Sequence, residues 1–248
     1  MNKKITKIAS LIMMLALLVC SAIVVEAYDY KVVQTNIIES YYSPIEKDVL
    51  DTNFYVENEA ILAERVINAE NTVAIYETAF DFSSQKDFDN FVAMYNSEKS
   101  LNDTILGTDA FFTTVYDKSN DTYSTALMGK ENGKMSVGAI YVNDGGSLFN
   151  IPEEKTFFTE INKYCNIDTI NCKYVIFKGV GSGIFVTDGE QELVVLLAPA
   201  YYVPIEANTI FTADEFVGEL IKYENTIVCG LGIYEINEEG EIDYIIGK

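Results

Sequence analysis

The chain contains no histidine, and this absence restricts its chemistry more than any other feature of the 248-residue sequence. Histidine is the usual general base near neutral pH, the commonest zinc ligand, and the group that activates a catalytic serine or cysteine. A zinc site built from cysteine alone needs four thiolates, and only three cysteines lie beyond residue 27. The sequence therefore excludes histidine-dependent hydrolases and a cysteine-only zinc site in residues 28–248.

Tryptophan is absent as well, and Arg65 is the only arginine. Without tryptophan the chain lacks the side chain that stacks most strongly on sugars, although its 17 tyrosines can take that role. Basic residues number 17 against 38 acidic ones, which gives a net charge of −21 at pH 7. Such a field repels phosphate backbones and anionic lipid headgroups, so we expect no nucleic-acid partner and an attraction for cationic partners or divalent metal.

The N-terminal segment has the three parts of a bacterial-type secretory signal. Lys3, Lys4 and Lys7 form a positive region, an uninterrupted apolar run covers residues 8–25, and the small residue Ala27 follows where signal peptidase requires one. We predict that residues 1–27 are a signal peptide and that the protein is secreted or associated with the outer side of the cell envelope. Cleavage would remove three lysines and one glutamate, which moves the net charge from −21 to −23.

Two other interpretations of this segment remain open. The 18-residue apolar run reaches the short limit of a membrane-spanning helix, so the first is an uncleaved anchor with its positive end inside. The second is lipidation at Cys20, although Val19 is larger than the residue that usually precedes a lipidated cysteine. All three interpretations place residues 28–248 outside the cytoplasm, and the membrane is reached only through this segment.

Cysteine use is compatible with export. Cys165 and Cys172 flank a turn-like segment, residues 166–171, and a bond between them would close that short loop. The odd number of cysteines, with Cys229 as the third, leaves at least one thiol unpaired. We predict a disulfide between Cys165 and Cys172; the alternative is that all three cysteines are buried as small apolar side chains.

Apolar periodicity and turn residues divide residues 28–248 into helical and strand-like stretches. Thr212 and Glu215, for example, form the pattern of a capping box at the start of a helix. Helices are predicted over residues 57–69, 83–95, 152–164 and 213–223. Strands are predicted over residues 30–36, 72–82, 110–116, 123–129, 135–142, 173–178, 183–186, 192–198, 226–236 and 242–246.

The connections between successive strands are short and polar, as in hairpins, and this favours antiparallel sheets. We predict an α+β fold in which helices pack on one face of the antiparallel sheet or sheets. After the signal peptide we expect α+β regions at 28–150 and 151–248, either as two subdomains, each a helix followed by a β-meander, or as one continuous unit. Segments 88–142 and 157–198 share this order of elements, but their residues do not align.

Three short motifs suggest chemistry but are better explained by local structure. Ser83 and Lys86 match Ser-x-x-Lys, yet the accompanying elements are missing and a serine is expected to cap the helix there. Residues 179–183 are rich in glycine but precede a strand, so they offer no helix N-terminus to a phosphate, and a turn or bulge is expected. Residues 117–122 resemble half of a calcium loop, and a polar turn is expected. We therefore predict no cofactor, with calcium as the alternative.

Carboxylate chemistry survives these exclusions, since a glycoside hydrolase needs only two suitably spaced carboxylates. Glu77, Asp81 and Asp87 lie near aromatic residues, but the abundance of acidic residues gives no reason to select a pair. Tyr201 and Tyr202 lie between two prolines, outside the periodic segments, and form a candidate recognition loop because interfaces favour tyrosine. We predict an exported, acidic, non-catalytic protein that binds a protein or cell-envelope component; the alternative is a carboxylate-dependent hydrolase acting on glycan.

Overall fold

The computed structural model describes residues 30–46, 49–131, 134–142, 145–152, 154–229, 233–236 and 242–245. The predicted signal peptide, residues 1–27, lies outside the described residues, so export stays a prediction. Within the described part of the chain, no helix is both long enough and apolar enough to cross a membrane.

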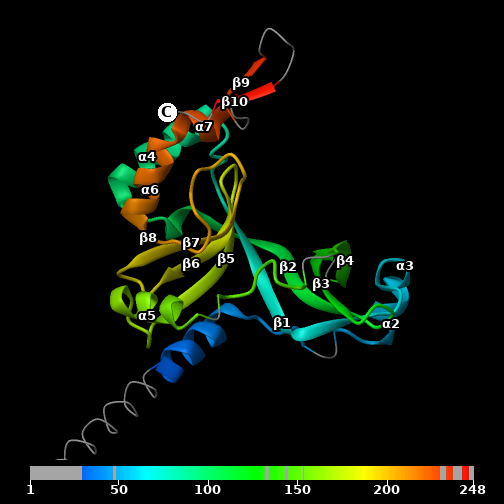
Figure 1. Ribbon diagram of the computed structural model, residues 1–248. Helices are drawn as coiled ribbons and strands as arrows, with labels where there is room; N and C mark the ends of the chain where they lie inside the picture. Colours follow the sequence, from blue (N-terminus) through cyan, green and yellow to red (C-terminus); the bar gives the residue numbers. More distant parts are fainter. Residues whose placement is uncertain are drawn as a thin grey trace, which may run out of the picture.

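An eight-stranded sheet in the order β4-β3-β2-β1-β5-β6-β7-β8 forms the centre of the molecule (Figure 1). Every neighbouring pair of strands is antiparallel except β1 and β5, which run parallel. The predicted α+β class and its antiparallel meanders are thus confirmed. The strands are β1 Arg65–Thr78, β2 Ile105–Asp117, β3 Thr122–Glu131, β4 Lys134–Tyr141, β5 Asn171–Phe177, β6 Gly181–Thr187, β7 Glu192–Pro199 and β8 Ile210–Thr212, with β9 Ile233–Ile236 and β10 Ile242–Ile245 in a separate two-stranded sheet.

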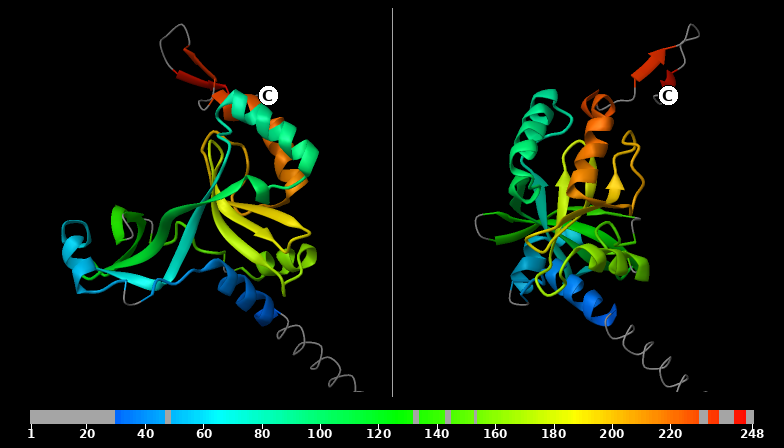
Figure 2. Two further views of the ribbon diagram at one scale, coloured as in Figure 1. Left: turned by 180° about the vertical axis from the view of Figure 1, so that it is seen from behind. Right: turned by 90° about the vertical axis from the view of Figure 1, so that its left-hand side faces the viewer.

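Helices flank the sheet on both faces (Figures 1 and 2). One face carries α4, α6 and α7, the other carries α5 and the helical residues 30–41, and the short helices α2 and α3 cover the outer strands. The bounds are α2 Thr52–Glu57, α3 Glu59–Leu62, α4 Gln85–Glu98, α5 Lys155–Tyr164, α6 Ala213–Lys222 and α7 Glu224–Cys229, with a 3-10 turn η1 at Asn102–Thr104.

The strands β5, β6 and β7 are buried on both sides, which explains the two layers of helices. β7 begins with a glutamate and continues as an uninterrupted apolar run, the pattern of a strand covered on two faces. Because alternate side chains point to opposite faces, Val194 and Leu196 enter one core while Leu193 and Val195 enter the other. The prediction that helices pack on only one face is therefore wrong, and this apolar run is the physical reason.

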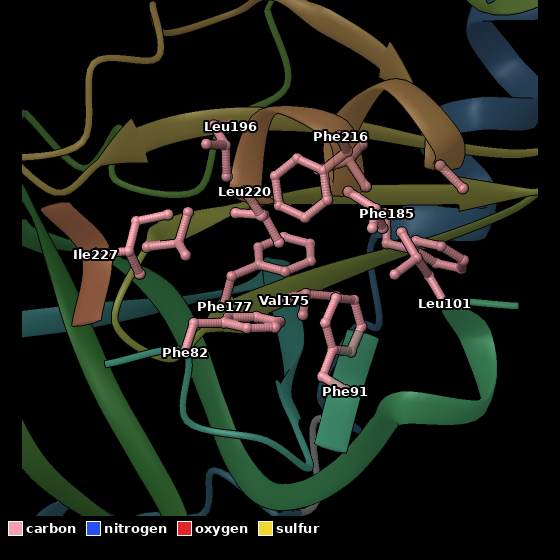
Figure 3. Packing of buried hydrophobic residues seen from close by; sticks show 14 of the residues in the cluster. Phe82, Phe91, Leu101, Val175, Phe177, Phe185, Leu196, Phe216, Leu220 and Ile227 are labelled. Carbon is pink, nitrogen blue, oxygen red and sulfur yellow. The ribbon is translucent and has the colours of Figure 1, made fainter. Parts of the chain in front are cut away.

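The first core lies between these strands and the helices α4 and α6 (Figure 3). Phe91 of α4 and Phe216 of α6 are fully buried and point into the same cluster as Phe177 of β5. The ring centroids of Phe177 and Phe216 are 5.1 Å apart, and those of Phe82 and Phe91 are 4.8 Å apart in an edge-to-face arrangement. Aromatic packing of this kind adds to the stabilisation from burial.

Both helices of the first core begin at the caps expected from the sequence. The Ser84 side chain accepts a hydrogen bond from the backbone N–H of Asp87 at the start of α4. Thr212 and Glu215 form a complete capping box at the start of α6. These two predictions are confirmed because a cap depends on only four consecutive residues.

The second core, which we call the α5 core, lies on the opposite face of the same strands. It buries Phe158 and Ile161 of α5 together with Val33, Ile37 and Tyr41 from the helical residues 30–41. The Tyr41 hydroxyl donates to the carbonyl oxygen of Phe149 at 2.7 Å, which ties the N-terminal helix to the loop after β4.

A third, smaller core supports the outer strands β3 and β4. Phe54 of α2 and Leu62 of α3 pack against Met128 of β3 and Val137 of β4. Asn58, between the two helices, accepts a hydrogen bond from the backbone N–H of Val137 at 2.9 Å. Since β4 is an edge strand, this contact covers one of the backbone donors through which edge strands pair with other chains.

The strand predicted over residues 30–36 is wrong, because residues 30–41 are helical. Val33, Ile37 and Tyr41 recur every four residues, and this stripe is buried against the sheet. The β-branched residues of the segment favour a strand locally, whereas burial of the stripe favours a helix and decides the outcome.

Two further predictions are wrong at element boundaries. The helix predicted over residues 57–69 stops at Leu62, and β1 begins at Arg65, because residues 65–68 pair with 114–117 of β2. The strand predicted over residues 226–236 is helical up to Cys229, in α7, and residues 233–236 form β9; residues 230–232 lie outside the described residues. In both cases long-range contacts override a local pattern.

The regions 28–150 and 151–248 contribute four strands each to the central sheet, and the parallel pair β1 and β5 joins them. Each of the two larger cores mixes residues of both regions. Helix α4 and the helical residues 30–41, from the first region, pack on strands β5, β6 and β7 of the second. The structure is thus one continuous sheet with shared cores.

Candidate functional site

The face of the sheet that carries the α5 core is open near the C-terminal end of β5. Tyr174 and Ile176 of β5 point to this face, and Lys178 follows directly after the end of the strand. Tyr174 belongs to the α5 core, whereas Ile176 is only partly buried and lines a shallow, open groove. We call it the aromatic groove. Its volume is about 340 Å³, and its lining includes Phe112, Tyr141, Leu148, Tyr174, Ile176 and Tyr202.

A row of aromatic rings forms one wall of the groove. The ring of Phe112 lies edge-to-face with Tyr141 at 5.9 Å and with Tyr174 at 5.5 Å between centroids. Phe149 stacks on the same Phe112 ring with an interplanar angle of 8°. Tyr174 is buried, and Tyr141, at the end of β4, is 42% exposed. The row therefore runs from the core to the surface, and each ring is held by its neighbour.

The floor of the groove lies opposite a bulge in β7, where Leu197 is the extra residue between the partners of Ser182 and Gly183. The register between β6 and β7 shifts between Ser182 and Gly183, and a Cβ atom added at Gly183 would lie 2.1 Å from the carbonyl oxygen of Val195. Next to this bulge, the Tyr174 hydroxyl and the Ser182 hydroxyl are hydrogen-bonded at 2.8 Å. Burial raises the pKa of Tyr174, so its phenol stays neutral at physiological pH. Of the turn or bulge expected within residues 179–183, the turn is present at residues 178–180, whereas the bulge lies across from them in β7.

The predicted recognition loop borders the groove. Tyr202 lines it and donates its hydroxyl to the carbonyl oxygen of Gly179 at 3.1 Å. Tyr201 is 76% exposed, and its ring lies edge-to-face with that of Tyr202 at 5.2 Å between centroids. A backbone hydrogen bond from Val203 to Ala200 closes the turn. The exposure expected of this loop is present for Tyr201; its role in recognition stays a proposal.

Charged groups lie at the end of the groove where β1 and β5 finish. The Lys178 ammonium pairs with the Glu77 carboxylate at 2.8 Å. Asp81 lies in the loop after β1 and accepts hydrogen bonds from the Ser83 hydroxyl at 2.6 Å and from its backbone N–H at 3.0 Å. Burial raises the pKa of Tyr202, and Tyr201 and the charge of Asp81 add to the rise. The backbone N–H of Phe82 donates to the carbonyl oxygen of Lys178 at 2.9 Å, which holds the loop that carries Asp81 at this end of the groove.

The carboxylates singled out in the sequence do not meet as a catalytic pair in this groove. None of the described residues that line it carries a carboxylate. Glu77 is engaged by Lys178, and Asp87 accepts a hydrogen bond from the backbone N–H of Asp81 at 3.3 Å. The Ser83 hydroxyl bonds to Asp81, and its neighbour Ser84 caps α4, so Ser-x-x-Lys has the structural role expected of it.

A second hollow, of about 330 Å³, lies between α5 and the segment before β8. Glu154, Glu160 and Tyr164 line it. Glu154 is exposed and accepts a hydrogen bond from the hydroxyl of Thr156, while Glu160 pairs with Lys163. Neither carboxylate has the apolar, buried surroundings that create a general acid in glycosidases.

Residues 117–122 form the polar turn between β2 and β3, as expected. Asp117 accepts hydrogen bonds from the backbone and hydroxyl of Ser119 and pairs with Arg65 at 3.0 Å. Across the described ranges, no group of three or more histidine, cysteine, aspartate or glutamate side chains is placed to hold a metal ion. The prediction of no cofactor, with calcium as the alternative, stays untested.

Cys165 and Cys172 are free thiols in the structure, not the predicted disulfide. Both are buried in the α5 core, where a thiol packs as a small apolar group. Burial raises the pKa of each thiol to about 12, so neither forms a thiolate at neutral pH.

Sequence reasoning found the loop tyrosines but missed the wall of the groove. Phe112 and Tyr141 come from β2 and β4 of one meander, and the pairing of β1 with β5 brings Tyr174 of the second region next to them. A signal existed in β5, where Cys172, Tyr174 and Ile176 alternate toward Lys178 and indicate a face that changes from core to surface.

Comparisons with known proteins give no match: no family model, no curated protein and no solved structure matches this chain.

Proposed function

We propose that this chain is an exported, acidic, non-catalytic protein that binds a protein or cell-envelope component in the aromatic groove. The observation that carries the proposal is the row of rings ending at the exposed Tyr141. Rings fixed by their neighbours offer a large contact area and lose little conformational entropy on binding, which is why interfaces are rich in tyrosine. The lack of carboxylates in the described lining supports binding over hydrolysis.

The proposal is tested by cross-linking and capture from envelope and secreted fractions of the native host, with the full chain as bait. The groove variant carries Tyr141→Ala and Tyr202→Ala. The control is Tyr123→Ala on β3, because Tyr123 is 52% exposed and lines neither the groove nor the hollow beside α5. We expect the wild-type chain and the control to capture the same partner and the groove variant to lose it. Equal capture by all three proteins would remove the groove from the proposal.

A second candidate function is hydrolysis of glycan at the hollow beside α5, since two carboxylates and a tyrosine line it. Glu160→Gln replaces one carboxylate with an uncharged amide of nearly the same size. If the chain releases reducing sugar from envelope glycan and Glu160→Gln abolishes the release, hydrolysis replaces binding as the function. If the wild-type chain releases none, this candidate is eliminated.

A further inference from the structure

The shape of the aromatic groove indicates that its ligand belongs to a larger molecule. Its volume of about 340 Å³ is near the lower end of the range for small-molecule sites, which enclose most of their ligand. This groove is open along its length and cannot enclose a free small molecule. It can hold a short stretch of a macromolecule whose remaining surface contacts the rim.

The polar groups of the groove are too few for a glycan. Sugar hydroxyls that enter a site need hydrogen-bond partners there, because a buried polar group without a partner is unfavourable. Two tyrosine hydroxyls of the lining are already engaged, Tyr174 with Ser182 and Tyr202 with the carbonyl of Gly179. The rest of the lining is mainly aliphatic and aromatic. Apolar side chains of a polypeptide suit this surface better than a sugar ring.

The charge near the groove favours a cationic ligand. Lys178, the one charged residue of the described lining, is paired with Glu77. The next charge at this end is Asp81, whose neighbour Phe82 donates its backbone N–H to the Lys178 carbonyl oxygen. No lysine or arginine among the described residues pairs with Asp81. The net charge of the whole chain, −21, has the same sign as Asp81. An acidic surface of this kind accelerates encounter with basic partners and repels acidic ones.

We propose that the groove binds an extended, basic polypeptide segment of a partner protein, with proline or aliphatic side chains between Tyr141 and Tyr202 and a lysine or arginine near Asp81. Aromatic-lined grooves bind such segments because an extended, proline-containing chain is already ordered and loses little entropy on docking. This inference rests on the proposed function and names the class of its ligand.

The test is selection of a displayed random peptide library on the full chain, with counter-selection on the Tyr141→Ala, Tyr202→Ala variant. We expect enriched sequences that combine lysine or arginine with proline or aliphatic residues. A labelled copy of an enriched peptide is then titrated by fluorescence polarisation, since the chain has no tryptophan of its own to report binding. Tyr141→Ala is expected to weaken binding about tenfold or more. Asp81→Asn is expected to weaken it about threefold, and only at low salt.

Two controls separate docking from general stickiness. Tyr123→Ala removes an exposed tyrosine outside both the groove and the hollow beside α5 and is expected to leave the affinity unchanged. A peptide with glutamate in place of each basic residue is expected to bind at least tenfold more weakly. Enrichment of acidic peptides, or equal affinity of wild type and Tyr141→Ala, would overturn the inference.

The outcomes also distinguish this inference from the proposed function. If no peptide is enriched but the envelope capture yields a partner that depends on Tyr141 and Tyr202, the proposed function stands and the peptide class is wrong. If a soluble envelope glycan binds and is lost in the groove variant, the ligand is a glycan and the inference falls. If neither selection nor capture depends on the groove, both fall together.

Discussion

Replacing Gly183 with alanine tests how closely β6 approaches β7. A Cβ atom at this position would lie 2.1 Å from the Val195 carbonyl oxygen and 2.8 Å from the Leu196 Cα atom. Both neighbours are backbone atoms of a central strand that is buried on two faces, so they cannot turn away as a flexible side chain would. Relief requires the two strands to separate at the bulge beside Ser182.

The size of the effect follows from these contacts. Overpacking a well-packed interior costs about 1–3 kcal/mol, and loss of one ladder hydrogen bond adds about 1 kcal/mol. We expect Gly183→Ala to lower the free energy of unfolding by about 3 kcal/mol. Separation of the strands would also displace Ser182 from the Tyr174 hydroxyl. The folded fraction of the variant should therefore bind the ligand of the groove more weakly than the wild type.

Two other glycines serve as matched controls in urea unfolding. Gly138→Ala places its Cβ at an ordinary 3.7 Å from Leu127, and we expect it to be neutral or to stabilise by about 0.5 kcal/mol. Gly189 has φ of +94° and open space around it, so Gly189→Ala should cost only about 1–2 kcal/mol of backbone strain. The urea midpoints should shift without a change in slope. If Gly183→Ala costs no more than Gly189→Ala, the close approach of β6 and β7 is refuted.

Three further predictions concern the cores and the titrating groups. Phe91→Ala should lower the free energy of unfolding by about 3–5 kcal/mol, measured by urea unfolding, because Phe91 is fully buried in the first core. The Ser119 hydrogen bonds, with a smaller contribution from Arg65, lower the pKa of Asp117 below its usual 3.8. The ionised Asp117 should therefore stabilise the fold above pH 3.8, and this stabilisation should be lost as the pH falls through the lowered pKa. A profile of melting temperature against pH should show this loss for the wild type and lack it for Asp117→Asn. The pKa values of Cys165 and Cys172 are raised from 9.0 to about 12, which keeps both thiols protonated in the folded chain. At about pH 8, iodoacetamide should therefore modify them only after the chain unfolds. Their contribution to the free energy of unfolding should disappear as the pH rises from 9.0 to about 12.

The parts of the fold that depend on neighbouring residues were predictable from the sequence. The hairpins over 110–142 and 173–198 follow from apolar runs separated by polar turns, and the structure has β2 to β4 and β5 to β7 there. The helices α4 and α6 follow from a cap and an apolar stripe. In each case, the residues that determine the element lie within it or within four residues of it.

What the sequence did not indicate depends on partners distant along the chain. The parallel pairing of β1 with β5 has no local signature, because Ile75 and Tyr174 meet only in the folded chain. The helical residues 30–41 needed the apolar faces of β5, β6 and β7 as their partners. The aromatic wall of the groove depends on the pairing of β1 with β5, so the sequence did not indicate it. Only the loop with Tyr201 and Tyr202 could be selected from the sequence.

The sharing of cores between the two regions has a consequence for the order of folding. Residues 30–41 and α4 are synthesised first, yet the strands that cover their apolar stripes begin only at Asn171. A contact of such sequence separation forms slowly, since the entropy of closing the intervening loop is lost before the contact stabilises the chain. The first region can close its β1-to-β4 meander early but cannot bury its helices alone. Both larger cores therefore need β5, β6 and β7, and a chain that ends before β5 would leave the apolar stripes of residues 30–41 and α4 uncovered.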